Sequence, residues 1–146
     1  MTILPRRAMT TEYDAYQELC SYSLAHPAPT FLHQHVVDAF AAQHASETTK
    51  PIQVTFALVG LYLHIERNFT GRQVQRAHMA LASRTSSWPT LALPARRGSI
   101  TVMDVLATPA GPDRDRAIDA WCAVVWDAYR DNEPAVTAFL RRHGIL

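Results

Sequence analysis

Most of this chain spaces its apolar residues three or four positions apart, and prolines or glycines separate many of the resulting segments. This spacing is typical of amphipathic helices, and no segment alternates apolar and polar residues as a strand would. The expected helices cover about 11–24, 30–45, 51–69, 72–82, 101–108, 112–129 and 132–143. We therefore predict an all-α fold, a compact bundle of about six to seven helices.

The length of 146 residues is enough for one domain with a real hydrophobic core. We predict a single helical domain over 1–146, with an N-terminal tail at 1–9 and one long irregular loop at 83–99. Loops of this length often serve as lids or binding segments, although Trp88 and its apolar neighbours would pack the loop equally well. Caps are expected at Thr10 or Thr11, at Thr30, and at Thr101 with Asp104.

The formal charge of +1 argues against nucleic acid and against an anionic membrane surface as partners. Five glycines do not form a nucleotide-binding fingerprint, so no nucleotide cofactor is expected. The start of the chain lacks the apolar stretch of a signal peptide, and the longest uncharged stretch is too short to span a bilayer. Cys20 and Cys122 lie in separate helical patterns and do not form a disulfide framework. We predict a cytoplasmic protein.

Titratable side chains interrupt the two most apolar segments. Residues 31–44 contain His33, His35, Asp38 and His44, and residues 52–69 contain Gln53, Tyr62, His64 and Glu66. Such groups are costly in a core unless they are paired or belong to a site. On a helix, His35 and Asp38 lie about 60° apart and less than about 5 Å apart along the axis, so their side chains can converge.

A short connection makes these two helices antiparallel neighbours. With the turn centred near Thr48 and Thr49, His33 falls level with His64, and His44 falls level with Gln53. His35 then falls level with Tyr62, one turn from Glu66, and Gly60 permits close backbone approach beside Asp38.

Two interpretations of these residues stay open. In the first, the protein is an enzyme that acts on a small-molecule metabolite by general acid–base or single-metal catalysis. His35 is then the base or a metal ligand, Asp38 orients it or is a second ligand, and Glu66 with Tyr62 completes the site. One divalent ion, zinc, iron or manganese, would suit His35, Asp38 and Glu66. His33, His44, Gln53 and His64 would support them.

In the second interpretation the protein is a non-catalytic interaction or ligand-binding protein. Its internal histidines are then structural, because buried polar groups are normally satisfied by hydrogen bonds within the core. An open cavity reaching Tyr62 and Glu66 would favour the enzyme, and a closed apolar core around His35 would favour the alternative.

The segment 112–129 carries more apolar surface than one stripe against a small core requires. Its apolar residues are Ile118, Trp121, Cys122, Val125, Trp126 and Tyr129. This surface packs either on the Trp88 loop of the same chain or on a second copy in a two-fold homodimer.

From about Tyr13 to its end, the chain resembles a family of small, uncharacterised bacterial proteins that is common in actinomycetes and classed as a domain of unknown function. The residues that carry the resemblance are His35, Asp38, Phe40 (tyrosine in the family), Gln43, His44, Gln53, Gly60, Leu61, Glu66, Arg67, Trp88, Thr101, Val102, Asp104, Val105, Trp121 and Trp126. The family pattern has N-terminal cysteines that this chain lacks, one of them at Tyr13, and a histidine where Ala57 stands. The resemblance implies a divergent member that lacks any zinc site formed by those groups, and it carries no established activity over to this chain.

Overall fold

The computed structural model describes residues 11–25 and 30–146. Its elements are α2 (Glu12–Leu24), α3 (Leu32–Gln43), α4 (Pro51–Arg67), α5 (Gly71–Arg84), α6 (Val102–Ala107), α7 (Pro112–Ala128), the 3₁₀ turn η1 (Arg130–Asn132) and α8 (Glu133–Arg142). No strand occurs in the part of the chain that the structure describes, so the predicted all-α bundle is confirmed. The predicted tail at 1–9 lies outside the described residues.

Several helices begin where the sequence predicts. Thr11 caps α2, and Thr101 with Asp104 caps α6, each through a reciprocal capping box. Thr30, however, does not cap α3. Phe31 takes that place with a positive φ of 44°, and it makes no capping hydrogen bond through its side chain.

Gly71 was expected to separate two helices, but it is the first residue of α5. Its N–H donates to the carbonyl of Thr30 at 2.6 Å, and a Cβ atom here would lie 1.8 Å from the carbonyl oxygen of Phe31. The glycine is therefore needed for close contact between the start of α5 and the start of α3.

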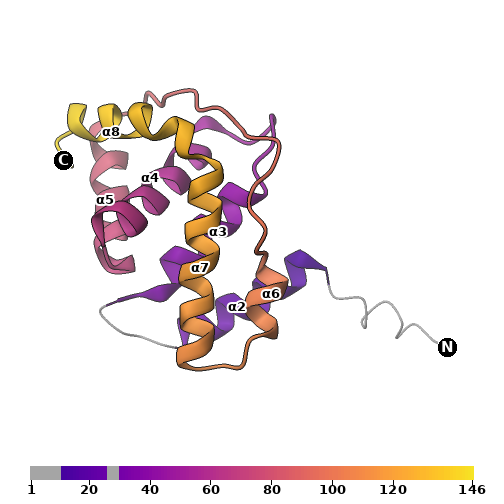
Figure 1. Ribbon diagram of the computed structural model, residues 1–146. Coiled ribbons are helices and arrows are strands. Elements are labelled where there is room, and N and C mark those ends of the chain that lie inside the picture. Colours follow the sequence, from indigo (N-terminus) through magenta and orange to yellow (C-terminus); the bar gives the residue numbers. More distant parts are fainter. Residues whose placement is uncertain (1–10, 26–29) are drawn as a thin grey trace.

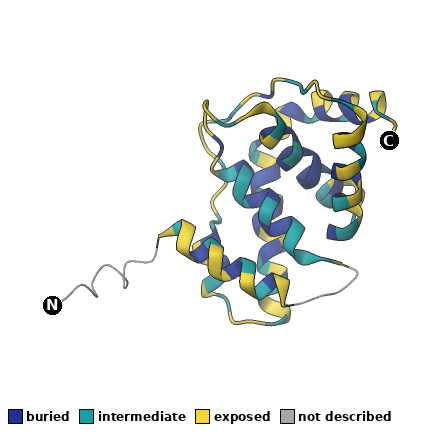
Figure 2. Cartoon of the chain, turned by 180° about the vertical axis from the view of Figure 1, so that it is seen from behind, coloured by how far each residue is buried: buried dark blue, intermediate teal, exposed yellow. Residues whose placement is uncertain are grey.

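The helices surround one hydrophobic core (Figures 1 and 2). Figure 1 shows α7 crossing the bundle in front of α3 and α4, with α2 and α6 at its lower end and α8 across its upper end. The apolar stripe of α7 is completely buried within this single chain, at Ile118, Trp121, Cys122, Val125, Trp126 and Tyr129. The surface that raised the question of a second copy is thus already occupied inside the fold.

The loop predicted at 83–99 begins two residues later than expected, since α5 continues to Arg84. Trp88 packs against Phe56 and Phe139. The side chain of Asn132 donates to the carbonyl of Ala92 at 2.9 Å and accepts from its N–H at 2.8 Å. These contacts hold the loop against the body of the protein.

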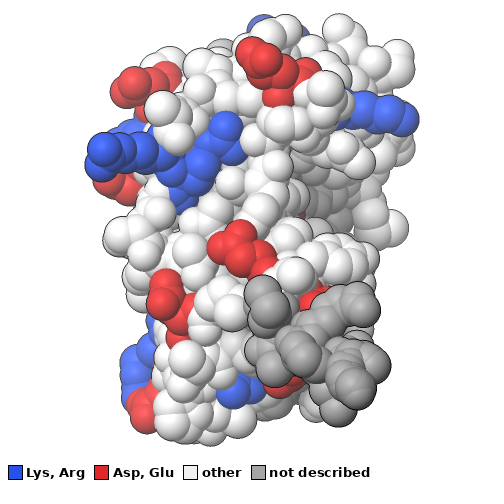
Figure 3. Space-filling model, turned by 90° about the vertical axis from the view of Figure 1, so that its right-hand side faces the viewer, with Lys and Arg blue, Asp and Glu red and all other residues white. Residues whose placement is uncertain are grey.

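None of the described helices is both long and apolar enough to cross a membrane. On the face drawn in Figure 3, acidic and basic side chains are interspersed rather than gathered into a patch of one sign.

Candidate functional site

The α3 and α4 helices run antiparallel, and Gly60 allows their close approach. A Cβ atom on Gly60 would lie 1.8 Å from Oδ2 of Asp38 and 2.5 Å from its Cγ. The carboxyl group of Asp38 therefore occupies the space that any larger residue at position 60 would fill. The predicted close approach of Gly60 and Asp38 is confirmed.

The predicted register is shifted by about half a turn. His35, rather than His33, meets His64, and the two rings stack with centroids 3.6 Å apart and planes 16° apart. His33 and His35 differ by about 200° around the helix, so only one of them can face α4.

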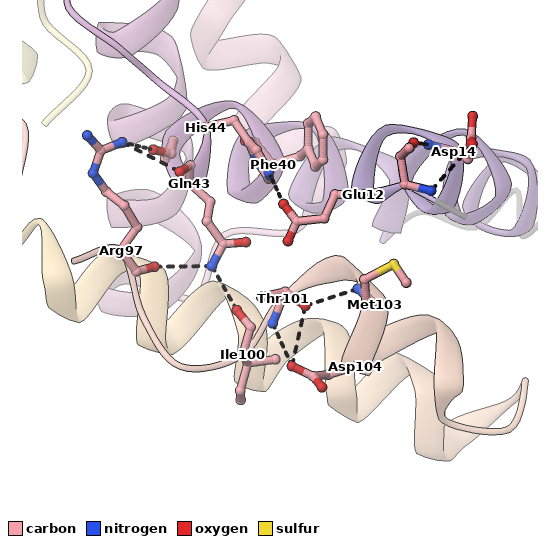
Figure 4. Close-up of polar contacts among 12 residues, drawn as sticks. Glu12, Asp14, Phe40, Gln43, His44, Arg97, Ile100, Thr101, Met103 and Asp104 are labelled. Carbon is pink, nitrogen blue, oxygen red and sulfur yellow. Dashed lines mark hydrogen bonds and ion pairs between the residues drawn. The ribbon is translucent and has the colours of Figure 1, made fainter. Parts of the chain in front are cut away.

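His33 and His44 face α2 instead. Nδ1 of His33 lies 3.0 Å from Oγ of Ser23, and Nε2 of His44 lies 2.5 Å from a carboxylate oxygen of Glu12 (Figure 4). Glu12 and Ser23 are themselves eleven residues apart, as are His33 and His44. The eleven-residue spacing of His33 and His44 therefore matches Ser23 and Glu12 on α2, and not His64 and Gln53 on α4.

A groove of about 520 Å³ opens between α3, α4 and α5. Its walls are mostly apolar, with Phe40 and Phe56 among them, and His44 and Gln53 lie on them. Asp38 and Gln34 of α3 and His78 of α5 also line it.

Asp38 is the most unusual group in this groove. Its side chain is buried, with the residue only 3 % exposed. Oδ1 accepts a hydrogen bond from Nε2 of Gln34 at 3.1 Å, whereas Oδ2 has no hydrogen-bond partner among the described residues. Burial raises the pKa of this carboxyl well above its ordinary value, and the hydrogen bond from Gln34 opposes the shift.

His35 lies in a different place, a cleft of about 390 Å³ between α3, α4 and α7. His64 and Asp119 line the same cleft, and Nε2 of His64 lies 3.0 Å from Oδ1 of Asp119. Burial, reinforced by the neighbouring His64, lowers the pKa of His35 to about 3, and Asp119 opposes this shift. His35 is therefore neutral near pH 7, and its buried Nδ1 has no partner among the described residues. The structure thus separates His35 from Asp38.

Tyr62 and Glu66 form a third cluster, at the C-terminal end of α4. Glu66 accepts hydrogen bonds from Nε1 of Trp126 at 2.8 Å and from Arg130 at 2.6 Å, and these two bonds lower its pKa. The hydroxyl of Tyr62 accepts from Nε of Arg67 at 2.9 Å. This cluster fastens α4 to α7 and lies apart from His35 and Asp38.

The three ligands proposed for a divalent metal therefore do not converge. No group of three His, Cys, Asp or Glu side chains within residues 11–25 and 30–146 could hold a metal ion. His35, Asp38 and Glu66 are separated because they meet three different neighbours, His64, Gly60 and Trp126.

Gln43 joins α3 to α7 and to the long loop (Figure 4). Its Nε2 donates to the carbonyls of Ile100 and Arg97, and its Oε1 accepts from Nε1 of Trp121 at 2.9 Å. Arg97, in the long loop, donates to the carbonyl of Ala45 at 2.7 Å. These residues hold the fold together.

Sequence reasoning missed His78 and Asp119. His78 lies four residues after Val74 and three before Leu81, on the buried stripe of α5, so helical spacing could have singled it out. Asp119 has no such signal, because it is one of several carboxylates on the exposed side of α7.

The fold and its groove define a small helical-bundle protein with a partly polar recess between three helices. The chain belongs to the family of unknown function DUF5946, whose model matches residues 11–130. No curated protein and no solved structure matches it.

Proposed function

We propose that this protein is a cytoplasmic binding protein for a small molecule, and that the groove between α3, α4 and α5 is its binding site. One observation carries the proposal: Asp38 lines a groove large enough for a ligand, and its buried carboxyl oxygen Oδ2 has no hydrogen-bond partner among the described residues. An unsatisfied buried polar group costs about 1–3 kcal/mol, and a ligand that pairs with it recovers part of this cost.

The groove also has the composition of a ligand site. Binding pockets are mostly apolar, have volumes of about 300–1,000 Å³, and carry a few polar groups that orient the ligand. Here Phe40, Phe56 and Ala57 supply the apolar walls, while Asp38 and His78 supply polar groups.

Filling the groove is expected to abolish binding. We would titrate the protein with a fragment library of neutral, cationic and anionic aromatic compounds and follow its amide NMR signals. Binders should shift signals of groove residues in the wild type, and Ala41→Phe, which places a ring in the groove, should remove those shifts.

Ala123→Phe provides the matched control. Ala123 lines a shallow cavity beside Gly98 and Val124, away from the groove, and is half-buried as Ala41 is. This variant should bind the same fragments as the wild type. Fragments that bind equally well to Ala41→Phe, or a complete absence of shifts at groove residues, would contradict the proposed site.

Acid–base catalysis in the cleft is a second candidate, favoured by the stacked pair of His35 and His64. Both ring nitrogens of His64 face oxygen atoms, of Asp119 and of Phe69, and these contacts hold its ring against that of His35. Neutral His35 would accept the proton from a substrate. The candidate keeps His35 as the base and replaces Asp38 by His64 and Asp119.

Elimination of 5-nitrobenzisoxazole, a probe reaction for proton abstraction, tests this candidate. If His35 is the base, the rate should not change between pH 5 and pH 8, because the pKa of His35 is about 3. His35→Gln should reduce the rate to background, and His33→Gln should not. Equal rates in the wild type and His35→Gln would eliminate the candidate.

A further inference from the structure

The neighbours of Asp38 favour the protonated, uncharged form of its carboxyl group. This protonation state restricts the kind of ligand that the groove can bind. Among the described residues, no cationic group compensates a charge on this carboxyl. Its direct partner is the neutral amide of Gln34, and its other oxygen lies against the backbone of Gly60. Since Oδ1 accepts a hydrogen bond, the proton of the neutral carboxyl resides on Oδ2, which makes Oδ2 a hydrogen-bond donor.

Two further titratable groups line the groove: His44, whose Nε2 lies 2.5 Å from a carboxylate oxygen of Glu12, and His78, which is uncharged near pH 7. Burial lowers the pKa of His78 to about 4, although its hydrogen bond to Phe56 opposes the shift. Its Nε2 donates to the carbonyl of Phe56 at 2.8 Å, and the ring stacks on that of Phe56 with centroids 4.6 Å apart. The neutral tautomer then leaves Nδ1 as an acceptor.

Other rings already pack against the two phenylalanines of the groove. The ring of Phe40 is stacked against Tyr16 and His44, with centroids 4.0 and 4.1 Å away. The ring of Phe56 is covered by His78 and meets Trp88 edge-on at 5.3 Å. A cation–π site requires an exposed ring face, so the walls provide apolar contact rather than charge recognition.

We propose that the groove selects an uncharged molecule with an apolar body and a carbonyl oxygen, of the amide class, and that Oδ2 of Asp38 donates a hydrogen bond to that oxygen. This assignment rests on the proposed function. The last torsion of an aspartate side chain is broad, so the hydroxyl can turn from Gly60 toward an acceptor in the groove. An amide N–H of the ligand would donate to Nδ1 of His78.

A matched series of probes tests the assignment. Benzamide, benzylammonium, benzoate and toluene share one ring and differ in the charge and hydrogen bonding of one substituent. Each is titrated near pH 7 up to about 10 mM, a range suited to Kd values near 1 mM. Benzamide should shift groove signals, and the two ions should not. Toluene should bind at least about tenfold more weakly than benzamide, which corresponds to about 1.4 kcal/mol.

Substitutions at Asp38 provide the complementary test. Asp38→Asn keeps an uncharged donor and should bind benzamide within about threefold of the wild type, whereas Asp38→Ala should weaken binding at least about tenfold. Asp113→Asn, on the exposed first turn of α7, is the control and should change nothing. If Asp38→Ala does not fold, the comparison of benzamide with toluene in the wild type still decides the matter.

The outcomes separate the ligand class from the proposed function. Tighter binding of benzylammonium than of benzamide, lost in Ala41→Phe, would keep the groove as the site and overturn the amide class. Equal binding of benzamide and toluene would also overturn it. If no probe and no library fragment binds in the groove, the proposed function fails with it.

Discussion

Gly60→Ala is expected to lower the free energy of unfolding by about 1–2 kcal/mol, measured by urea denaturation. In an ordinary helix position the same change stabilises by about 1 kcal/mol, because alanine has the higher helix propensity. Here the added methyl group would lie 1.8 Å from Oδ2 of Asp38, and overpacking of this kind costs about 1–3 kcal/mol or more. The clash outweighs the gain in propensity.

The double variant Asp38→Ala, Gly60→Ala identifies the cause. Removing the carboxyl also removes the atoms that the new methyl group would meet, so the double variant should be more stable than the sum of the two single effects implies. A Gly60→Ala protein as stable as the wild type, or strictly additive effects, would show that the carboxyl does not fill this space.

Acidification below pH 6.5 is expected to destabilise the protein through His35 and His78. Burial lowers the pKa of these rings to about 3 and about 4, whereas in the unfolded chain they titrate near 6.5. The unfolded state then binds more protons as the pH falls, and each histidine removes about 1.4 kcal/mol of stability per pH unit. His33, whose pKa burial also lowers, acts in the same direction.

Asp38 acts in the opposite direction. Its pKa is raised in the fold, so its contribution to stability is complete below about 3.9 and is lost as the pH rises through its folded pKa. Asp38→Asn should therefore increase the loss of unfolding free energy on acidification by up to about 1.4 kcal/mol per pH unit. His78→Gln should decrease this loss by about the same amount. Urea unfolding at intervals from pH 7 to pH 5 measures both slopes. If neither variant changes the dependence of the unfolding free energy on pH, these assignments are contradicted.

The order and limits of the helices could be predicted because they depend on local chemistry. Thr11, Thr101 and the proline at the start of α4 act on the residues beside them, so the sequence alone indicates where each helix begins. The contact between Gly60 and Asp38 could also be predicted from the sequence, because the short connection between α3 and α4 makes these two helices neighbours.

The site was only partly predictable, because it depends on the direction in which each side chain leaves its helix. His35 and Asp38 are close in sequence, but about 60° of rotation is enough to place them in different recesses. The eleven-residue spacing of His33 and His44 fits polar residues on both α2 and α4. Only the packed structure shows that α2 provides the partners. Helix periodicity leaves such rotations and choices of partner open, and the packing of the whole core decides them.

The hydrogen bonds that residues distant in sequence donate to the end of α3 also have a consequence for synthesis of the chain. The carbonyl groups of Ala42 and Ala45 at the end of α3 accept from Tyr129 and Arg97. These partners leave the ribosome more than 50 residues after the helix, so these two side-chain hydrogen bonds can form only when most of the protein has been made. A chain that ends before Arg97 lacks both partners, so the link between the end of α3 and the C-terminal half depends on the last third of the sequence being present.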